Sequence, residues 1–251
     1  MALSRREVAL NAFLEREAPA YPFYPITMMY AADLTGRPYS EYATDASVLV
    51  EGQLAMAERF GASQISAISD PCVEAADLGA PIHYYDDSPP ANVEEEALLK
   101  DKTRLETLEV IDPGTGKRMS NRLEAVRLLA ERAGRERLVE GWVEGPCAEA
   151  ADLRGLNRIM MDFFDDEEFV VELMDFVSEQ EIRFALAQVE AGADIIGIGD
   201  AASSLIGPEI YGEFILPRTK KYCDAIHKAG ALVRLHICGR IEPLYPHIGE
   251  L

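Results

Sequence analysis

The chain has 251 residues, of which 48% are apolar, and a mean hydropathy of −0.06, values typical of a soluble globular protein. Its 44 acidic residues outnumber 24 basic ones, and the formal charge of −20 repels phosphate backbones and anionic membranes, so neither nucleic acid nor membrane is an expected partner. No apolar run approaches 18 residues and the first residues lack the apolar core of a secretory signal, so we expect a cytoplasmic protein.

The first half of the chain predicts two helices and two strands. A capping box at Ser4 and Glu7 opens a helix that extends to about residue 17. Aromatic and β-favouring residues predict a strand at 23–29, just before Tyr30. Helical spacing then covers 42–60, and a second short strand at 64–69 ends at Asp70.

The second half repeats this alternation after a polar excursion at 86–120, which we interpret as an excursion or lid within one domain. Helices ended by glycine alternate with strands followed by polar residues. The predicted elements are a helix at 121–133, a strand at 137–143 followed by Glu144, a helix at 165–190, a strand at 194–198 leading to Asp200, a helix at 208–229, and a last strand from residue 232.

The alternation predicts about five parallel strands joined by helical crossovers. Both a (β/α)₈ barrel and a doubly wound open sheet have this pattern. A Gly-x-Gly-x-x-Gly turn after the first strand is absent, and Gly197 and Gly199 are interpreted as sites of close helix–strand contact. A closed barrel would need roughly three more βα units than the sequence provides. In a barrel the chemistry lies at the carboxyl ends of the strands, which here carry Tyr30, Asp70, Glu144, Asp200, His236 and Cys238.

The last predicted strand ends in His236-Ile237-Cys238-Gly239. Side chains two apart on a strand share a face, so the imidazole of His236 and the thiol of Cys238 should meet at one point. One nitrogen and one sulfur ligand make half of a tetrahedral zinc site. The remaining cysteines, at positions 72, 147 and 223, form no Cys-x-x-Cys pair, and a disulfide framework is not expected.

Several motifs together resemble the uroporphyrinogen decarboxylase superfamily, and within it the zinc-dependent corrinoid methyltransferases that act on methylcobamide and coenzyme M. The resemblance runs over nearly the whole chain. The motifs are Ser69-Asp70-Pro71-Cys72-Val73-Glu74-Ala75, Glu144-Gly145-Pro146, Gly192-Ala193-Asp194 leading to Gly199-Asp200, and His236-Ile237-Cys238-Gly239.

The resemblance implies a single (β/α)₈ TIM barrel over residues 1–251, truncated after about five βα units. It also implies zinc bound by His236, Cys238 and a third cysteine that has no counterpart in these 251 residues. The implied activity is transfer of a methyl group between a methylcobamide (corrinoid) carrier protein and a thiol or a methylated small molecule.

The strand-end acids are candidates for catalytic work. Asp70 and Asp200 would act as acids or bases, or orient His236, and Glu144 would assist; each aspartate has an alternative role as a cap of the following segment. Tyr30 and Glu74 are the candidate substrate contacts.

Two alternative functions remain open. In the first, the protein is a decarboxylase acting on a tetrapyrrole, but the segment 28–33 lacks the arginines with which decarboxylases hold carboxylates, and Asp152 stands near the position of their tyrosine. In the second, the protein is an inactive barrel fragment that binds a partner such as a corrinoid protein.

Overall fold

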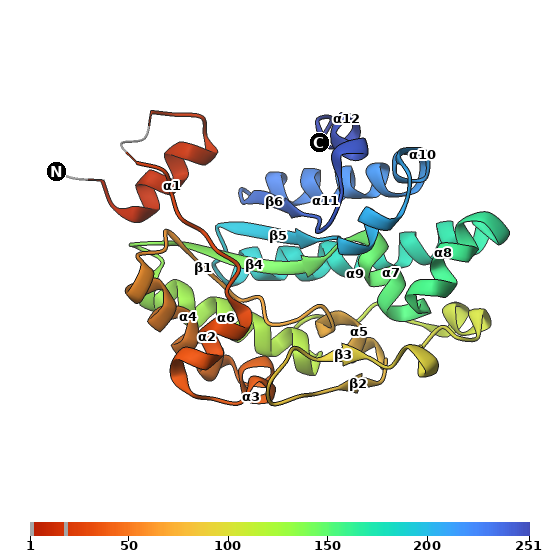
Figure 1. The fold of residues 1–251 in the computed structure, drawn as a ribbon, viewed down its shortest axis with the longest axis horizontal. Coiled ribbons are helices and arrows are strands. Elements are labelled where there is room, and N and C mark those ends of the chain that lie inside the picture. Colours follow the sequence, from red (N-terminus) through yellow and green to blue (C-terminus); the bar gives the residue numbers. More distant parts are fainter. Residues whose placement is uncertain (1–2, 18–19) are drawn as a thin grey trace.

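The computed structural model describes residues 3–17 and 20–251, in which helices and strands alternate (Figure 1). The strands are β1 (Gln64–Ser66), β2 (Ile82–His83), β3 (Ala91–Asn92), β4 (Leu138–Glu144), β5 (Ile195–Gly199) and β6 (Leu232–His236). The α-helices are α1 (Arg5–Phe13), α2 (Met28–Thr35), α3 (Tyr39–Thr44), α4 (Ala46–Phe60), α5 (Val73–Leu78), α6 (Lys117–Ala133), α7 (Pro146–Arg154), α8 (Leu156–Asp165), α9 (Glu167–Ala191), α10 (Pro208–Ile210), α11 (Leu216–Lys228) and α12 (Tyr245–Ile248). Shorter helical turns are η1 (Glu94–Glu96), η2 (Lys102–Thr107), η3 (Ala201–Leu205), η4 (Tyr211–Ile215) and η5 (Glu242–Leu244).

Strands β1, β4, β5 and β6 form one parallel sheet, in that order. Every connection between neighbouring strands contains at least one helix, as parallel pairing requires. Strands β2 and β3 form a separate antiparallel pair on the connection between β1 and β4. The predicted α/β architecture with a parallel sheet is confirmed.

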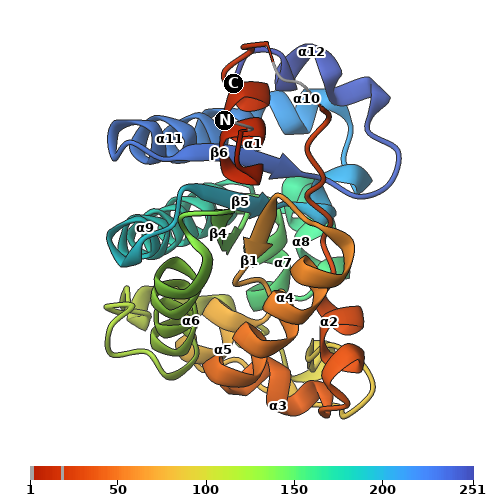
Figure 2. The same ribbon diagram turned by 90° about the vertical axis from the view of Figure 1, so that its left-hand side faces the viewer.

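Long helices cover one face of this sheet. Helices α6, α9 and α11 lie along it side by side, and α4 lies beside β1 (Figure 2). Gln188 of α9 ties the two layers together, since its side chain accepts from the backbone N–H of Trp142 and donates to its carbonyl, both at 2.8 Å. Val139, Val143, Ile196 and Ile198 point toward these helices and form part of the main apolar core.

The opposite face of the sheet is its inner face, where alternate residues of β4 line up as Glu140, Trp142 and Glu144. The indole of Trp142 lies directly against Gly197 and Gly199 of β5, where a Cβ atom would collide with the ring. The two glycines therefore make room for an inward-pointing ring. The interpretation of these glycines as helix–strand contacts was wrong, because the period of two turns them away from the helices.

The predicted strand at 23–29 is not formed, which is a correction. The segment runs in an extended but unpaired path, and helix α2 begins at Met28. Phe23 alone exchanges hydrogen bonds with Ser63 next to β1. Pro22 and Pro25 lack the N–H groups that a paired strand needs. The segment therefore forms no strand, although its aromatic residues favour one. The sheet of the described residues has four parallel strands where about five were expected.

Two predicted helices are each divided. Asp45 ends α3 and caps α4 through the backbone N–H of Ser47 at 2.8 Å, so the helix expected over 42–60 is two helices. The helix expected over 208–229 is α10, a wider π-helical turn η4, and α11. Across residues 3–17 and 20–251, none of the helices is long and apolar enough to cross a membrane.

The segment 86–120 is folded against the rest of the molecule. It contains β3, η1, η2 and the first turn of α6, and it buries Leu98 and Leu99. Arg154 of α7 donates to the carbonyl of Leu99 at 2.7 Å. The lid function assigned to this segment stays a prediction.

Gly197→Ala tests the packing on the inner face. A methyl group there meets the indole of Trp142, so we expect a loss of about 1–3 kcal/mol of unfolding free energy, measured by urea denaturation. Because Trp142 is the sole tryptophan of the chain, its fluorescence should shift in the folded variant. Gly207→Ala, whose added Cβ meets only the flexible end of Glu209, is the control and should stay near the wild type. Equal stability of the two variants would contradict the packing argument.

Candidate functional site

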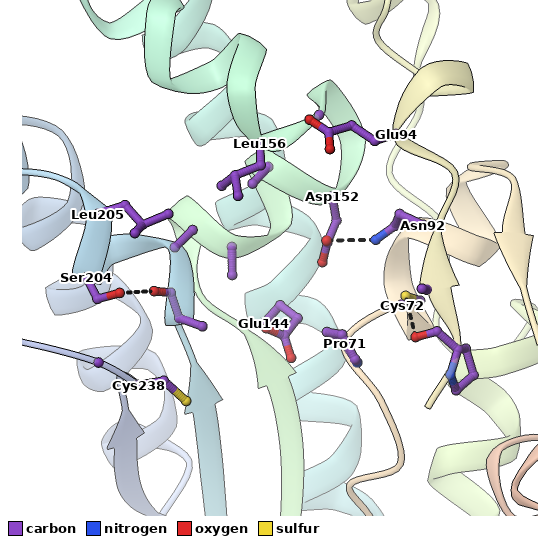
Figure 3. A pocket seen from close by; sticks show the side chains of 18 residues that line it. Pro71, Cys72, Asn92, Glu94, Glu144, Asp152, Leu156, Ser204, Leu205 and Cys238 are labelled. Carbon is purple, nitrogen blue, oxygen red and sulfur yellow. Dashed lines mark hydrogen bonds between the residues drawn. The ribbon is translucent and has the colours of Figure 1, made fainter. Parts of the chain in front are cut away.

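A cavity of about 510 Å³ lies at the carboxyl ends of the strands (Figure 3). Its walls come from the segments after β1, β4, β5 and β6, from the β3 region and from α7. The lining side chains are mostly small or apolar, with acids and thiols among them. The polar and ionisable side chains among them include Cys72, Asn92, Glu94, Glu144, Asp152 and Cys238.

His236 and Cys238 meet beside this cavity, and Cys238 lines it. The Nε2 atom of His236 lies 3.0 Å from Sγ of Cys238, so the two side chains share a face as the strand period predicts. Burial, with a smaller contribution from Arg234, lowers the pKa of His236, which favours the neutral imidazole that can bind a metal. Gly239 follows with a φ of 87°, a conformation that favours glycine and turns the chain away directly after Cys238.

Asp200, after β5, has a mainly structural set of contacts. Its Oδ1 accepts the backbone N–H of Ala148 at 2.8 Å, in the first turn of α7, and its Oδ2 accepts from the Ser203 hydroxyl at 2.6 Å. Burial raises its pKa to about 6. Its own backbone N–H donates to the carbonyl of His236 at 2.9 Å, and within the described residues no hydrogen bond joins the carboxyl group of Asp200 to the imidazole.

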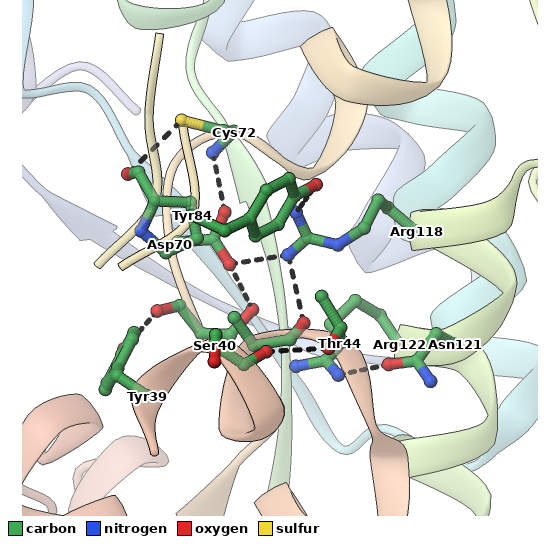
Figure 4. A network of polar contacts seen from close by, with 12 residues as sticks. Tyr39, Ser40, Thr44, Asp70, Cys72, Tyr84, Arg118, Asn121 and Arg122 are labelled. Carbon is green, nitrogen blue, oxygen red and sulfur yellow. Dashed lines mark hydrogen bonds and ion pairs between the residues drawn. The ribbon is translucent and has the colours of Figure 1, made fainter. Parts of the chain in front are cut away.

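Asp70, after β1, is held in a buried polar network (Figure 4). Its Oδ2 pairs with Nη2 of Arg118 at 2.6 Å, and the two side chains are 0% and 4% exposed. The Ser69 hydroxyl and the backbone N–H of Cys72 also donate to Asp70. Arg118 further donates to the hydroxyl of Tyr84 at 3.1 Å. The negative charge of Asp70 is thus already compensated by the guanidinium of Arg118 in the absence of a substrate.

Five carboxyl groups gather beside and behind the cavity: Glu74, Glu144, Glu149, Asp152 and Glu181. Burial is the largest cause that raises the pKa of each. Repulsion adds to it, from acids of the group in Glu144, Glu149, Asp152 and Glu181, and from Asp70 in Glu74. The pKa of Glu74 reaches about 7. Neither carboxyl oxygen of Glu149 or of Glu181 has a hydrogen-bond partner among the described residues.

The predicted site residues differ in how close they lie to the cavity. Glu144 and Cys238 line the cavity, with His236 beside Cys238. Asp70, Asp200 and Glu74 lie buried behind its walls. Tyr30 is on α2, 43% exposed and packed against Phe60, and does not line the cavity. The proposed roles of all these residues stay predictions.

Sequence reasoning missed Arg118, Glu149 and Glu181. Arg118 opens α6 within the segment interpreted as a polar excursion, and the two glutamates lie on helices whose buried faces are decided by tertiary packing. A charged residue at an otherwise apolar helix position is the one signal that points to Glu181, between Val177 and Phe184.

No group of three or more His, Cys, Asp or Glu side chains in the described part of the chain is arranged to hold a metal ion. His236 and Cys238 are a pair of ligands and not a complete set. All four cysteines are free.

Asp70→Ala should strongly destabilise the protein, because it leaves the charge of Arg118 buried without a partner. We expect a loss of about 3–5 kcal/mol in urea unfolding. Adding Arg118→Met to the same chain should restore part of the loss, since the unpaired charge is then gone. Glu179→Ala, which removes an exposed pair with Arg183, is the control and should cost less than about 1 kcal/mol. A loss of similar size in both single variants would refute the buried-pair argument.

Glu74→Gln tests the acid cluster through pH. The pKa of Glu74 rises from 4.5 to about 7 on folding, so the folded protein keeps a proton that the unfolded chain releases in this window. Its contribution to stability is therefore present below pH 4.5 and lost as pH rises to 7. The wild type should lose about 1–3 kcal/mol more than Glu74→Gln between these values. Urea midpoints from pH 4 to 8 measure this, with the exposed Glu51→Gln as control; parallel curves for all three proteins would contradict it.

Comparison with known proteins gives the family. The model of the uroporphyrinogen decarboxylase (URO-D) family matches residues 4–251. The methylcobamide:CoM methyltransferase MtbA of Methanosarcina acetivorans is 40% identical over 119 residues, which are 47% of this chain and 35% of that protein. A uroporphyrinogen decarboxylase of Rickettsia bellii is 22% identical over 194 residues, 75% of this chain and 55% of its own length.

A solved structure, a methyltransferase from Methanosarcina mazei, has the same fold with a TM-score of 0.89 at 23% identity. The match covers 99% of this chain and 74% of that one. The chain thus spans between about a third and just over half of these two curated relatives. Because the family model matches nearly its entire length, the chain belongs to the uroporphyrinogen decarboxylase (URO-D) family.

Proposed function

We propose that the protein is a methyltransferase that moves a methyl group between a corrinoid carrier protein and a thiol or a methylated small molecule, with zinc held at His236 and Cys238. The observation that carries this proposal is the convergence of an imidazole and a thiol at the cavity. The relative with 40% identity, named for methylcobamide and CoM, supports the same reaction class.

The His236–Cys238 pair fits part of a zinc site. Ligand bonds of about 2.0–2.1 Å to nitrogen and 2.3 Å to sulfur at a tetrahedral angle place the two ligand atoms about 3.5 Å apart. The observed separation is 3.0 Å, so a small side-chain movement suffices. The other tetrahedral positions would go to a third protein ligand, not found among the described residues, and to the substrate.

Neighbouring residues set the protonation and the orientation of the His236 imidazole. Burial lowers the pKa of His236 and so favours the neutral imidazole, and the ring of Trp142, 6.1 Å from the imidazole between centroids, limits where the imidazole can turn. Cys238 is exposed at the mouth, within reach of a docked carrier. Zinc bound here would lower the pKa of a substrate thiol and present it as a thiolate nucleophile.

A decarboxylase acting on a tetrapyrrole is less well supported. Its substrate carries many carboxylates, which need cations, and the described lining of the cavity holds acids instead. Arg118, the buried arginine nearest to Asp70, is already engaged by that carboxylate.

Metal analysis tests the zinc site directly. After equilibration with zinc and desalting, the wild type should retain more metal than His236→Ala or Cys238→Ser, because each variant removes one of two convergent ligands. His227→Ala and Cys223→Ser change the same residue types on α11, away from the cavity, and should retain as much as the wild type. Equal zinc content in all five proteins would contradict zinc binding by His236 and Cys238.

Methyl transfer is then followed by the visible spectrum of methylcobalamin mixed with the protein and a panel of thiols. Demethylation should require the protein and fall at least about tenfold in the two ligand variants. If no thiol causes a change, the reverse reaction is measured with reduced cobalamin and methylated donors. No spectral change in either direction would overturn the proposed function.

A further inference from the structure

A second cavity, of about 610 Å³, lies outside the candidate site. Its walls come from the end of α3, from α5, from the residue after β2 and from the start of α6. Lys117 and Arg118 of α6 line it, whereas the described lining of the candidate site has no cationic side chain. The proposed function gives this second cavity no role.

The buried network of Asp70 connects a wall of each cavity (Figure 4). Arg118, on the wall of the second cavity, pairs with Oδ2 of Asp70. The backbone N–H of Cys72, on the wall of the candidate site, donates to Oδ1 of Asp70 at 3.1 Å. The second cavity is therefore a neighbour of the candidate site, and the two have no described lining residue in common.

Arg118 has more donors than acceptors. Of its five N–H groups, one bonds to Asp70, one to the carbonyl of Ala43 and one to the hydroxyl of Tyr84. The side chain is 4% exposed, and its Nε is buried without a hydrogen-bond partner among the residues described. A buried donor without an acceptor is costly, so an acceptor placed in the cavity would stabilise this guanidinium.

Two further groups are open to a ligand that accepts hydrogen bonds. The hydroxyl of Tyr84 accepts from Arg118 and donates to no residue of the described ranges, so its own proton is available. Lys117 is exposed, and its ammonium pairs with no carboxylate in the described part of the chain. The hydroxyls of Thr44 and Thr115, by contrast, already donate to backbone carbonyl groups.

The one acid in the described lining, Asp77 of α5, is occupied by the helix itself. Its two oxygens accept the backbone N–H of Arg118 at 2.9 and 3.0 Å, and Oδ2 also accepts that of Met119 at 2.8 Å. These N–H groups lie in the first turn of α6, at the positive end of the helix dipole. The charge of Asp77 is thus offset there, and the side chains of Lys117 and Arg118 stay free for a ligand.

Cations outnumber carboxylates around the second cavity. Arg122, one turn after Arg118, is 2% exposed, and its Nε and Nη1 have no hydrogen-bond partner in residues 3–17 and 20–251. Burial, with repulsion from Arg118, lowers the pKa of Arg122 to about 10, so the guanidinium is still positive at neutral pH. Together with Lys117, these cations have two carboxylates beside them, Asp70 and Asp77. A bound anion would balance the excess.

The directions of the free donors favour a phosphate group. Lys117 and Arg118 reach the cavity from α6 and Tyr84 from the end of β2. The oxygens of a phosphate point in several directions and can accept from all three donors, whereas the two oxygens of a carboxylate lie in one plane. Ala76 and Ile111 add apolar wall against which carbon atoms attached to the phosphate can pack.

We propose that the second cavity binds a phosphate group, free or carried by a small organic molecule, through Lys117, Arg118 and Tyr84. Binding there requires neither zinc nor a corrinoid and is independent of methyl transfer.

Calorimetric titration of the full chain with inorganic phosphate, at an ionic strength fixed with sodium chloride, tests this site. Phosphate should bind at least about tenfold more tightly than acetate under the same conditions. Lys117→Gln removes one positive charge and Tyr84→Phe removes one hydroxyl, and each should weaken phosphate binding at least about fivefold.

Lys228→Gln and Tyr85→Phe are the matched controls, since they make the same changes at exposed positions outside the cavity, and both should bind phosphate as the wild type does. Circular dichroism verifies that each variant is folded. Equal affinity for phosphate and acetate, unchanged phosphate affinity in both cavity variants, or no binding of phosphate would overturn the inference. His236→Ala should bind phosphate normally, which separates this site from the proposed zinc site.

Discussion

The site depends on the parallel register of three strands. Glu144 of β4, Gly199 of β5 and His236 of β6 are aligned as neighbours in one row across the sheet. Because side chains alternate, all three positions face inward, and because the middle one is glycine, the indole of Trp142 can lie against β5 next to His236. A shift of one residue in β4 or β6 would turn its site residue into the helix layer. Packing of α9 and α11 on the outer face fixes that register and thereby the geometry of the cavity.

Two buried charge arrangements next to each other have opposite consequences. Asp70 and Arg118 form a closed pair whose remaining polar atoms largely bond to neighbours, so this arrangement holds the segment after β1 to α6 and leaves no charge for a ligand of the candidate site. In the described part of the chain, by contrast, the carboxyl oxygens of Glu149 and Glu181 have no hydrogen-bond partner. Since an unpaired buried charge is costly, the first arrangement is held as an ion pair, whereas in the second burial raises the pKa values and favours neutral carboxyl groups. The same residue type, a strand-end acid, thus takes different roles at Asp70 and Glu144.

Much of the fold and part of the site could be predicted from sequence, and the physical reasons differ by residue. The period of two placed His236 and Cys238 together, and strand ends located Glu144 and Asp200, because these are local properties of one strand. The pairing of Asp70 with Arg118 joins residues 48 positions apart and has no local signal. The strand expected before Tyr30 failed because composition was weighed above Pro22 and Pro25, and with it the expected position of Tyr30 at the cavity was lost.

The two walls of the cavity together restrict how a substrate can lie. His236 ends β6 and lies beside Cys238. Cys238 lines the cavity across from Glu144 of β4 and Asp152 of α7 (Figure 3). A molecule that placed its sulfur or methylated atom at the first wall and bonded to the carboxyl groups of the second would be held at two points, which would fix its direction. The apolar residues between the walls would contact the carbon chain that joins the two groups and exclude water from the reacting end. The distance between the two groups of the substrate would then be a basis for selection: a molecule too short to reach both walls would lose one of the two interactions, even when its reactive atom is correct.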